Sequence, residues 1–122
     1  MEILALVYSN DDAWAELSEE ERSAAYEGYM AVSRDLAAAG ALVDASELES
    51  TAAATSVRVR DGESLVTDGP YAEVKESLGG YYLFSCDTFD EAVDWAAKIP
   101  ATWHGGAVEI RAVHVDESGE AA

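Results

Sequence analysis

GGYYLFSCD, residues 79–87, is a short apolar run that predicts a β-strand with hydrophobic side chains on both faces. EILALVY, residues 2–8, has the same character near the start of the chain. Side chains alternate along a strand, so one face of the segment 2–8 carries Ile3, Ala5 and Val7 and the other carries Leu4, Leu6 and Tyr8. A sheet built around these two strands therefore needs cover from water on both of its faces.

Two helices are predicted from capping motifs that precede amphipathic stretches. Ser18 and Glu21 form an S-x-x-E capping box, and the helix that begins there is expected to end at Gly40. Thr88 and Glu91 repeat the capping pattern after the strand at 79–87. The expected buried stripes are Ala25, Tyr29, Val32 and Leu36, widened by Tyr26 and Met30, on the first helix, and Phe89, Ala92, Val93 and Ala96 on the second.

Two further strands and a hairpin complete the predicted fold. The strands are expected at 41–48 and 107–115, and the hairpin strands 54–60 and 63–69 flank Asp61-Gly62, a strong hairpin-turn signal. Arg58 and Arg60 alternate with valines, so we expect this hairpin to have one solvated face. The element order matches the ferredoxin-like β-α-β-β-α-β pattern with an extra hairpin. We predict one α+β domain over residues 1–122, in which residues 116–122 form a frayed tail.

Two helices can cover only one face of such a sheet. The second apolar face of the strands at 2–8 and 79–87 must be covered by something else. A second copy of the same sheet is the simplest solution, because identical apolar faces can pack against each other around a two-fold axis. The pattern therefore predicts a homodimer in which the two sheets pack face to face.

The chain is strongly acidic, with 25 Asp and Glu residues against 7 Lys and Arg residues and a net charge of −18. Such a charge repels nucleic acid and anionic membranes, and no basic stripe is present to neutralise phosphates. Direct binding of nucleic acid or membrane is therefore not expected. Solubility is a sufficient reason for the acidity, and adaptation to a salty cytoplasm is the alternative.

The first residues, MEILALVYSNDD, contain neither a basic n-region nor a long apolar run, so we expect a cytoplasmic protein without a signal peptide or membrane span. Cys86 is the only cysteine, which excludes an intrachain disulfide and a thiolate zinc cluster. Its apolar strand favours a small core residue over a nucleophile. The sequence has no metal-ligand spacing or phosphate-binding loop, so it implies no metal and no cofactor.

TDGPYAEVKES, residues 67–77, precedes the strand at 79–87 and is the most diagnostic motif of the chain. The longer stretch DGPYAEVKESLGGYYLF resembles the signature of the YCII-related family, and most closely that of its DGPF branch, with Tyr71 where the branch has phenylalanine. The flanking segments AWAELSEEER, VRVRDG, EAVDWAAKIP and VEIRAV resemble the same branch. The resemblance therefore runs from Ile3 to Val115.

This resemblance implies a ferredoxin-like domain that pairs into a dimeric α+β barrel. It also implies two kinds of function. Some relatives act on chlorinated hydroxyquinones, whereas the DGPF branch is linked to sigma factors and so to transcription initiation, through protein or small-ligand contacts. Members thought to be enzymes have a histidine on the first helix together with an aspartate. The predicted helix 18–39 has no histidine here, since the two histidines are His104 and His114, so the sequence leaves open whether the protein is an enzyme.

Asp68 matches the aspartate of the branch motif and is the candidate catalytic residue, as the acid or base of a cofactor-free enzyme acting on a small hydroxylated or aromatic substrate. The alternative is a turn residue that bonds its own backbone before Gly69-Pro70. Lys75 and Glu73 are candidate ligand-binding residues that would hold an anionic group and move a proton. Alternatively, they form weak ion pairs on a solvated surface.

Glu109 and Arg111 are two residues apart on the last predicted strand and therefore share a face. They are candidates to orient a ligand, or else a structural pair across strands or across the dimer interface. Tyr29 is a further candidate, either in the wall of an aromatic pocket or simply in the core. Three functions stay open: a dimeric regulator with a sigma factor or another protein as partner, a cofactor-free enzyme, and an interaction module without chemistry.

Overall fold

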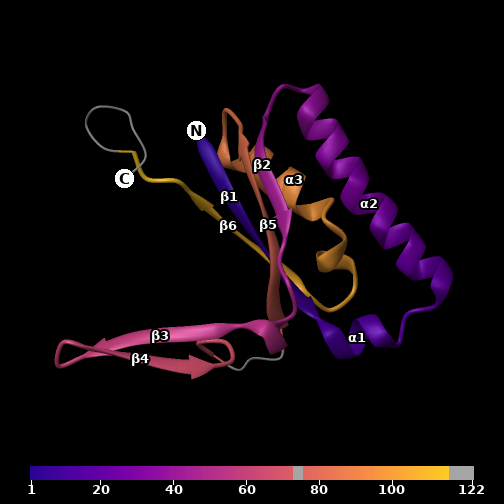
Figure 1. Cartoon of the computed structure of the whole chain (residues 1–122). Coiled ribbons are helices and arrows are strands. Elements are labelled where there is room, and N and C mark those ends of the chain that lie inside the picture. Colours follow the sequence, from indigo (N-terminus) through magenta and orange to yellow (C-terminus); the bar gives the residue numbers. More distant parts are fainter. Residues whose placement is uncertain (73–75, 116–122) are drawn as a thin grey trace.

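A computed structural model describes residues 1–72 and 76–115 as an α+β domain. Within these residues the chain forms three α-helices, two short 3-10 helices and six strands (Figure 1). In chain order they are β1 (Glu2–Asn10), α1 (Asp11–Ala15), α2 (Glu19–Ala38), β2 (Leu42–Glu47), η1 (Thr51–Ala53), β3 (Thr55–Arg60), β4 (Glu63–Asp68), β5 (Glu76–Ser85), α3 (Phe89–Ala97), η2 (Pro100–Trp103) and β6 (Ala107–Ala112). The short helix α1 is not among the elements predicted from the sequence, and the predicted tail at 116–122 lies outside the described residues.

The main sheet has four strands in the order β2-β5-β1-β6, and each neighbouring pair is antiparallel. This order, with a helix after the first strand and another after the third, is the ferredoxin-like arrangement, so the predicted fold class is confirmed. The additional strands β3 and β4 pair with each other in a separate two-stranded sheet. Their turn has positive φ at Asp61 (53°) and Gly62 (78°), as a tight hairpin turn requires.

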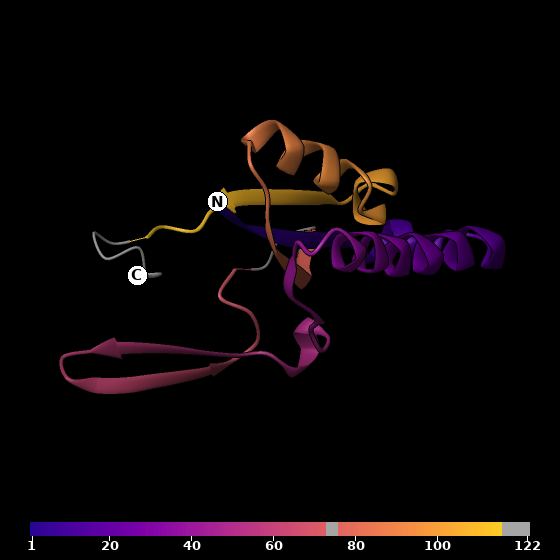
Figure 2. The ribbon, with the colours of Figure 1, turned by 90° about the horizontal axis from the view of Figure 1, so that it is seen from above.

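Helices α2 and α3 lie on one side of the main sheet and cover one of its faces (Figures 1 and 2). The core forms where they meet the alternate side chains of β1 and β5. Ile3, Ala5, Tyr82 and Phe84 are buried on the covered face, and β1 and β5 hold Ile3 beside Phe84 and Ala5 beside Tyr82. Cys86, predicted to lie in the strand as a small core residue, follows the end of β5 and is half-buried against the edge of this core.

The capping motifs act as the sequence predicts. Ser18 Oγ accepts a hydrogen bond from the Glu21 N–H (3.1 Å), and the Glu21 carboxylate accepts one from the Ser18 N–H (3.1 Å), which completes the capping box of α2. Gly40 follows the last turn of α2 with φ +70°, a left-handed conformation that glycine adopts at little cost. Thr88 caps α3 by accepting a hydrogen bond from the Glu91 N–H (3.2 Å).

The apolar stripe of α2 is narrower than predicted. Ala25, Val32 and Leu36 are buried, but Tyr26 and Met30 are 58% and 69% exposed. The sheet contacts α2 from one side, so residues at the edges of the predicted stripe face outward.

The prediction for α3 is wrong in the same way. Ala92 and Ala96 are buried, whereas Phe89 and Val93, predicted as core, are 46% and 48% exposed. Alanine has the smallest apolar side chain, so α3 approaches the core through its alanines; Trp95 packs against the edge of the core, and Phe89 and Val93 face outward.

Among the described residues, no helix covers the other face of the main sheet, which we call the open face. Leu4, Leu6 and Tyr8 point away from the buried residues of β1 and are half-buried, and Leu83 and Tyr81 lie beside Leu4 and Leu6 on β5. The β3–β4 hairpin projects from the domain on the side of the sheet away from α3 (Figure 2).

The hairpin departs from the prediction of a single solvated face. Val57 and Val59, on the side expected to be dry, are 63% and 70% exposed, because nothing in the described part of this one chain covers them. Among the described helices, none is long and apolar enough to cross a membrane.

Candidate functional site

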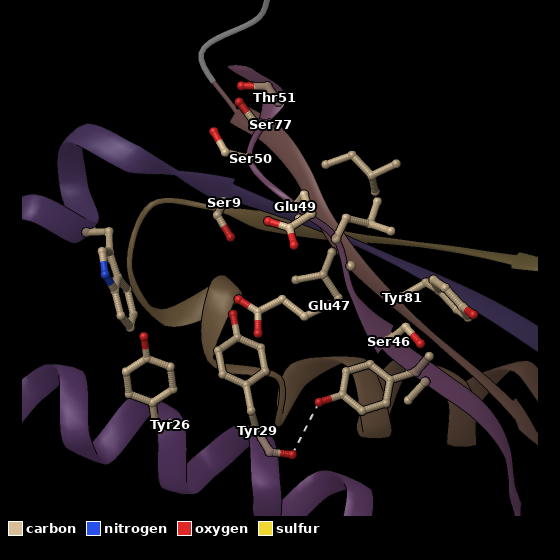
Figure 3. Close-up of a pocket in the computed structure, with 18 of the residues that line it drawn as sticks. Ser9, Tyr26, Tyr29, Ser46, Glu47, Glu49, Ser50, Thr51, Ser77 and Tyr81 are labelled. Atoms are coloured by element: carbon tan, nitrogen blue, oxygen red, sulfur yellow. Dashed lines mark hydrogen bonds between the residues drawn. The ribbon is translucent and has the colours of Figure 1, made fainter. Parts of the chain in front are cut away.

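A cleft of about 600 Å³ opens between α2 and the neighbouring ends of β1, β2 and β5. Figure 3 shows side chains from these elements converging on it. Its volume falls within the range of small-molecule sites. The cleft is bounded by Ser9, by Trp14 of α1, by Tyr26, Tyr29 and Ser33 of α2, by residues 45–51, and by residues 77–82 of β5. We call it the Tyr29 cleft.

Aromatic rings form the wall of the cleft on the α1 and α2 side. The Trp14 ring meets the Tyr26 ring edge to face, with centroids 5.6 Å apart and an interplanar angle of 82°. Arg22 fixes the backbone beside Trp14, because its guanidinium donates hydrogen bonds to the carbonyl oxygens of Trp14 (3.3 Å) and Ala15 (2.9 Å). Trp14 is thereby held at the cleft although α1 has only five residues.

Tyr29 is half-buried on α2 and points toward the middle of the cleft (Figure 3). The hydroxyl of the buried Tyr82 donates to the carbonyl oxygen of Tyr29 (3.2 Å), which ties this turn of α2 to β5. Burial, together with the neighbouring Tyr82, raises the pKa of the Tyr29 hydroxyl, and burial also raises the pKa of Tyr82. Both hydroxyls are therefore neutral near pH 7 and able to donate hydrogen bonds.

The opposite wall is polar and acidic. Glu47, at the end of β2, extends toward the Tyr29 hydroxyl, and Glu49 extends toward Ser9 (Figure 3). Ser50 and Ser77 add hydroxyls at the far end. A phenol-sized group in the cleft would therefore meet aromatic faces on one side and hydrogen-bonding oxygens on the other.

Two features of the sheet shape the floor of the cleft. The pairing of β1 with β5 shifts by one residue between Val7 and Tyr8, which places Gly79 at the irregularity. At Gly80, a Cβ atom would lie only 2.7 Å from the carbonyl oxygen of Ser46, so only glycine lets β2 approach β5 this closely. Gly80, the second residue of the Gly-Gly pair, is thus a structural requirement of the cleft, whereas a Cβ atom at Gly79 would make only ordinary contacts with Ser9 and Val7.

A second, much smaller cavity of about 20 Å³ adjoins the same wall. It shares Ser9, Trp14 and Tyr29 with the Tyr29 cleft and is closed on its other side by the half-buried His104. His104 thus lies near the cleft although it comes from a loop far along the chain.

Of the residues predicted as sites, Tyr29 lines the cleft and three others lie elsewhere. Asp68 is exposed at the end of β4, where the adjacent Gly69 donates its N–H to the Ala54 carbonyl oxygen (2.7 Å). Glu109 and Arg111 are exposed on β6, beside Leu6 and Leu4 of β1 on the open face of the sheet. Glu73 and Lys75 lie outside the described residues, so their predicted roles stay predictions.

Sequence reasoning missed Trp14, Tyr26, Glu47 and Glu49 as cleft residues. A tryptophan in a segment otherwise full of acids was the available signal for Trp14, since large aromatic residues are seldom placed in a loop without a contact. Nothing local distinguishes Glu47 and Glu49 from the other acids of the chain.

Comparison with known proteins finds matches that span nearly the whole chain. The model of the YCII-related domain matches residues 1–115. The chain belongs to the YCII-related family. A relative from Rhizobium meliloti (strain 1021), described as "Uncharacterized protein R00369", is 36% identical over 119 residues, which cover 94% of each chain.

In this YCII-related chain, the cleft side of α2 carries Tyr26, Tyr29 and Ser33 and no histidine. Within residues 1–72 and 76–115, no three His, Cys, Asp or Glu side chains are grouped so that they could hold a metal ion. The cleft of this YCII-related protein thus offers neutral phenols, hydroxyls and carboxylates, which are groups that bind and orient a ligand.

Proposed function

We propose that this YCII-related protein binds a small hydroxylated or aromatic molecule in the Tyr29 cleft and works as a homodimer. The observation that supports binding is the convergence of five aromatic side chains and several oxygen atoms on one cavity of about 600 Å³. Small-molecule sites have this composition, with apolar walls and a few polar groups that set the orientation of the ligand.

The test is a thermal-shift screen of small phenols and hydroxylated aromatic compounds, because a ligand that binds the folded state raises its apparent stability. The matched variants are Tyr26→Ala, at the rim of the cleft, and Tyr71→Ala, beside the hairpin, both of which remove an exposed tyrosine (58% and 78%). We expect Tyr26→Ala to weaken binding by about tenfold, the loss of one aromatic contact, and Tyr71→Ala to leave it unchanged. Equal effects of the two variants would argue against this cleft.

The enzymatic alternative requires a reactive group at the bound molecule. Asp68, the candidate acid or base, does not line the cleft in this single chain, whereas Tyr29 and Glu47 do. We therefore propose binding as the primary function and expect Asp68→Asn to leave ligand affinity unchanged. Turnover of a bound phenol that is lost in Asp68→Asn would favour the enzyme instead.

The homodimer is supported by the open face of the sheet. Leu4, Leu6, Tyr8 and Leu83 form an apolar surface there, and the exposed valines of the hairpin lie on the same side of the domain. A second copy that packs its own open face on this surface would cover both sets at once. In such a dimer Glu109 and Arg111, at the edge of that face, would lie at the interface.

We further propose that the dimer reports ligand binding through a protein contact, with a sigma factor as the first candidate partner in the cytoplasm. The support is the DGPF-like motif at Asp68-Gly69-Pro70 and the net charge of −18, which suits a basic protein surface and repels DNA. Pull-downs from cells at low and physiological salt, with and without a ligand found by the screen, test this link. Recovery of neither a sigma factor nor a polymerase subunit would leave the interaction module as the better description.

A further inference from the structure

We infer that the ligand of the Tyr29 cleft carries a positively charged amine on its aromatic or hydroxylated frame. This inference rests on the proposed function and adds the charge of the ligand. It follows from the pairing, in one cavity, of aromatic faces with carboxylates.

The charged residues that line the cleft are all acidic within the described part of the chain: Asp11, Glu47 and Glu49. The ion pair formed among the described residues, Arg34 with Asp35, involves none of these three acids. A carboxylate on the ligand would meet like charges at the cleft, and an ammonium would meet opposite ones.

The aromatic wall favours the same charge. The face of an aromatic ring carries negative electrostatic potential, so it attracts an ammonium group placed within about 6 Å of its centroid. Trp14 and Tyr26 already lie edge to face at 5.6 Å, and Tyr29 stands next to them on α2. An amine between these rings and Glu47 would satisfy a cation–π contact and a charge-assisted hydrogen bond at once.

The dimensions of the cleft favour a compact amine. Its volume of about 600 Å³ has room for one or two rings with a short side chain. The hydroxyls of Tyr26, Tyr29 and the serines that line the cleft can bind a hydroxyl group at the other end of the same ligand.

Three probes with one frame and different end groups isolate the charge: tyramine, 4-hydroxyphenylethanol and 4-hydroxyphenylacetate. They share the phenol ring and the two-carbon chain and end in an ammonium, a hydroxyl and a carboxylate. Calorimetric titration of the full chain at physiological salt should rank them in that order. We expect tyramine to bind about tenfold more tightly than the alcohol, as one cation–π contact and one exposed ion pair together allow.

Matched variants separate the cleft from the overall negative charge. Glu47→Gln removes one charge at the cleft, and Asp94→Asn removes one from the exposed side of α3, which contributes nothing to the cleft. Glu47→Gln should weaken tyramine binding by about fivefold and leave the alcohol unaffected, whereas Asp94→Asn should change neither. Equal losses in the two variants would mean that the field of the whole protein attracts the amine, which overturns the inference.

The remaining outcomes distinguish this inference from the function on which it rests. Equal affinity for all three probes, or tightest binding of 4-hydroxyphenylacetate, overturns the charge of the ligand and leaves the binding function standing. Binding of none of the three overturns both. Tightest binding of tyramine with the loss confined to Glu47→Gln supports both.

Discussion

Gly28 lies where α2 crosses η2, and the two elements are in contact because this residue has no side chain. A Cβ atom at this position would lie 2.7 Å from Pro100 Cγ and 3.0 Å from Trp103 Cη2. The proline ring is rigid and buried, so it cannot move aside at little cost. The packing of the cleft-bearing helix therefore depends on one glycine in its interior.

Gly28→Ala should destabilise the protein although alanine is the better helix former. Helix propensity alone would add about 1 kcal/mol to the free energy of unfolding. Overpacking against Pro100 and Trp103 costs about 1–3 kcal/mol, so we expect a net loss of about 1 kcal/mol in urea unfolding. Ser23→Ala, at an exposed position on the same helix, is the control and should be neutral or slightly stabilising. A higher free energy of unfolding for Gly28→Ala than for wild type would show that η2 moves aside at little cost.

Cys86 is a second residue whose contacts indicate a structural role. Its thiol donates to the carbonyl oxygen of Thr88 (3.2 Å). Burial and the nearby acid Glu91 raise the pKa of this thiol, so the thiolate is disfavoured near neutral pH. These contacts fit a packing role at the edge of the core and speak against a nucleophile.

Helix α2 is the element that depends most clearly on a local motif. Hydrogen bonds from Ser18 hold the pKa of Glu21 below its ordinary value. The bond from the backbone N–H has the larger effect, and the bond from the side chain has the smaller one. Glu21 also lies in the first turn, where the helix dipole favours a negative charge. The capping box therefore stabilises α2 most when Glu21 is ionised.

This assignment predicts a pH-dependent effect of Glu21→Gln. Because the pKa of Glu21 is lower in the folded than in the unfolded chain, ionised Glu21 stabilises the fold at pH values above the ordinary glutamate pKa of about 4.3. This stabilisation is lost as the pH falls through the lower pKa of the folded state. Wild type should therefore exceed Glu21→Gln in free energy of unfolding at neutral pH, and the gap should close in acid. Urea unfolding at a series of pH values measures it.

Glu27→Gln is the matched control for this experiment. It removes the same charge from an exposed position in the middle of α2, away from the capping box. Both variants relieve the same general repulsion in a chain of net charge −18. A pH dependence of equal size in both variants would assign the effect to overall charge and not to the cap.

At the scale of the whole molecule, the open face of the sheet is the feature that residues 1–72 and 76–115 leave without a covering layer. Leu6 lies at its centre, between Tyr81 on β5 and Glu109 on β6. In the proposed dimer a glutamate at position 6 would be buried against an apolar surface and next to the like charge of Glu109, which is strongly unfavourable. In a monomer the same substitution would remain in water.

Leu6→Glu should therefore convert the dimer to a monomer. Light scattering coupled to size-exclusion chromatography at micromolar concentration should give twice the mass of one chain for wild type and the mass of one chain for Leu6→Glu. Val93→Glu places a glutamate at a half-exposed valine on the helix side and should remain dimeric. Circular dichroism of each variant verifies that the fold is retained. Monomeric wild type, or dimeric Leu6→Glu, would refute the proposed packing.

The sequence by itself determined the two long helices, the six strands and their order, although it missed α1 and placed the ends of β5 and β6 two or three residues away from where they lie. Capping at Ser18, the left-handed residue at Gly40 and the turn at Asp61-Gly62 depend on contacts within a few residues, so they can be read locally. Alternating and helical periodicities then restrict the element order to few topologies, of which the ferredoxin-like one is observed.

Only the tertiary structure decided which side chains share a cavity. Tyr29 could be predicted because it lies on the inner side of a long helix, but Trp14, Glu47 and His104 reach the same region from three separate segments. Their meeting depends on the strand irregularity at Val7 and on the close approach of β2 to β5. Such geometry is set by packing between segments distant in sequence, and no pattern within one segment contains it.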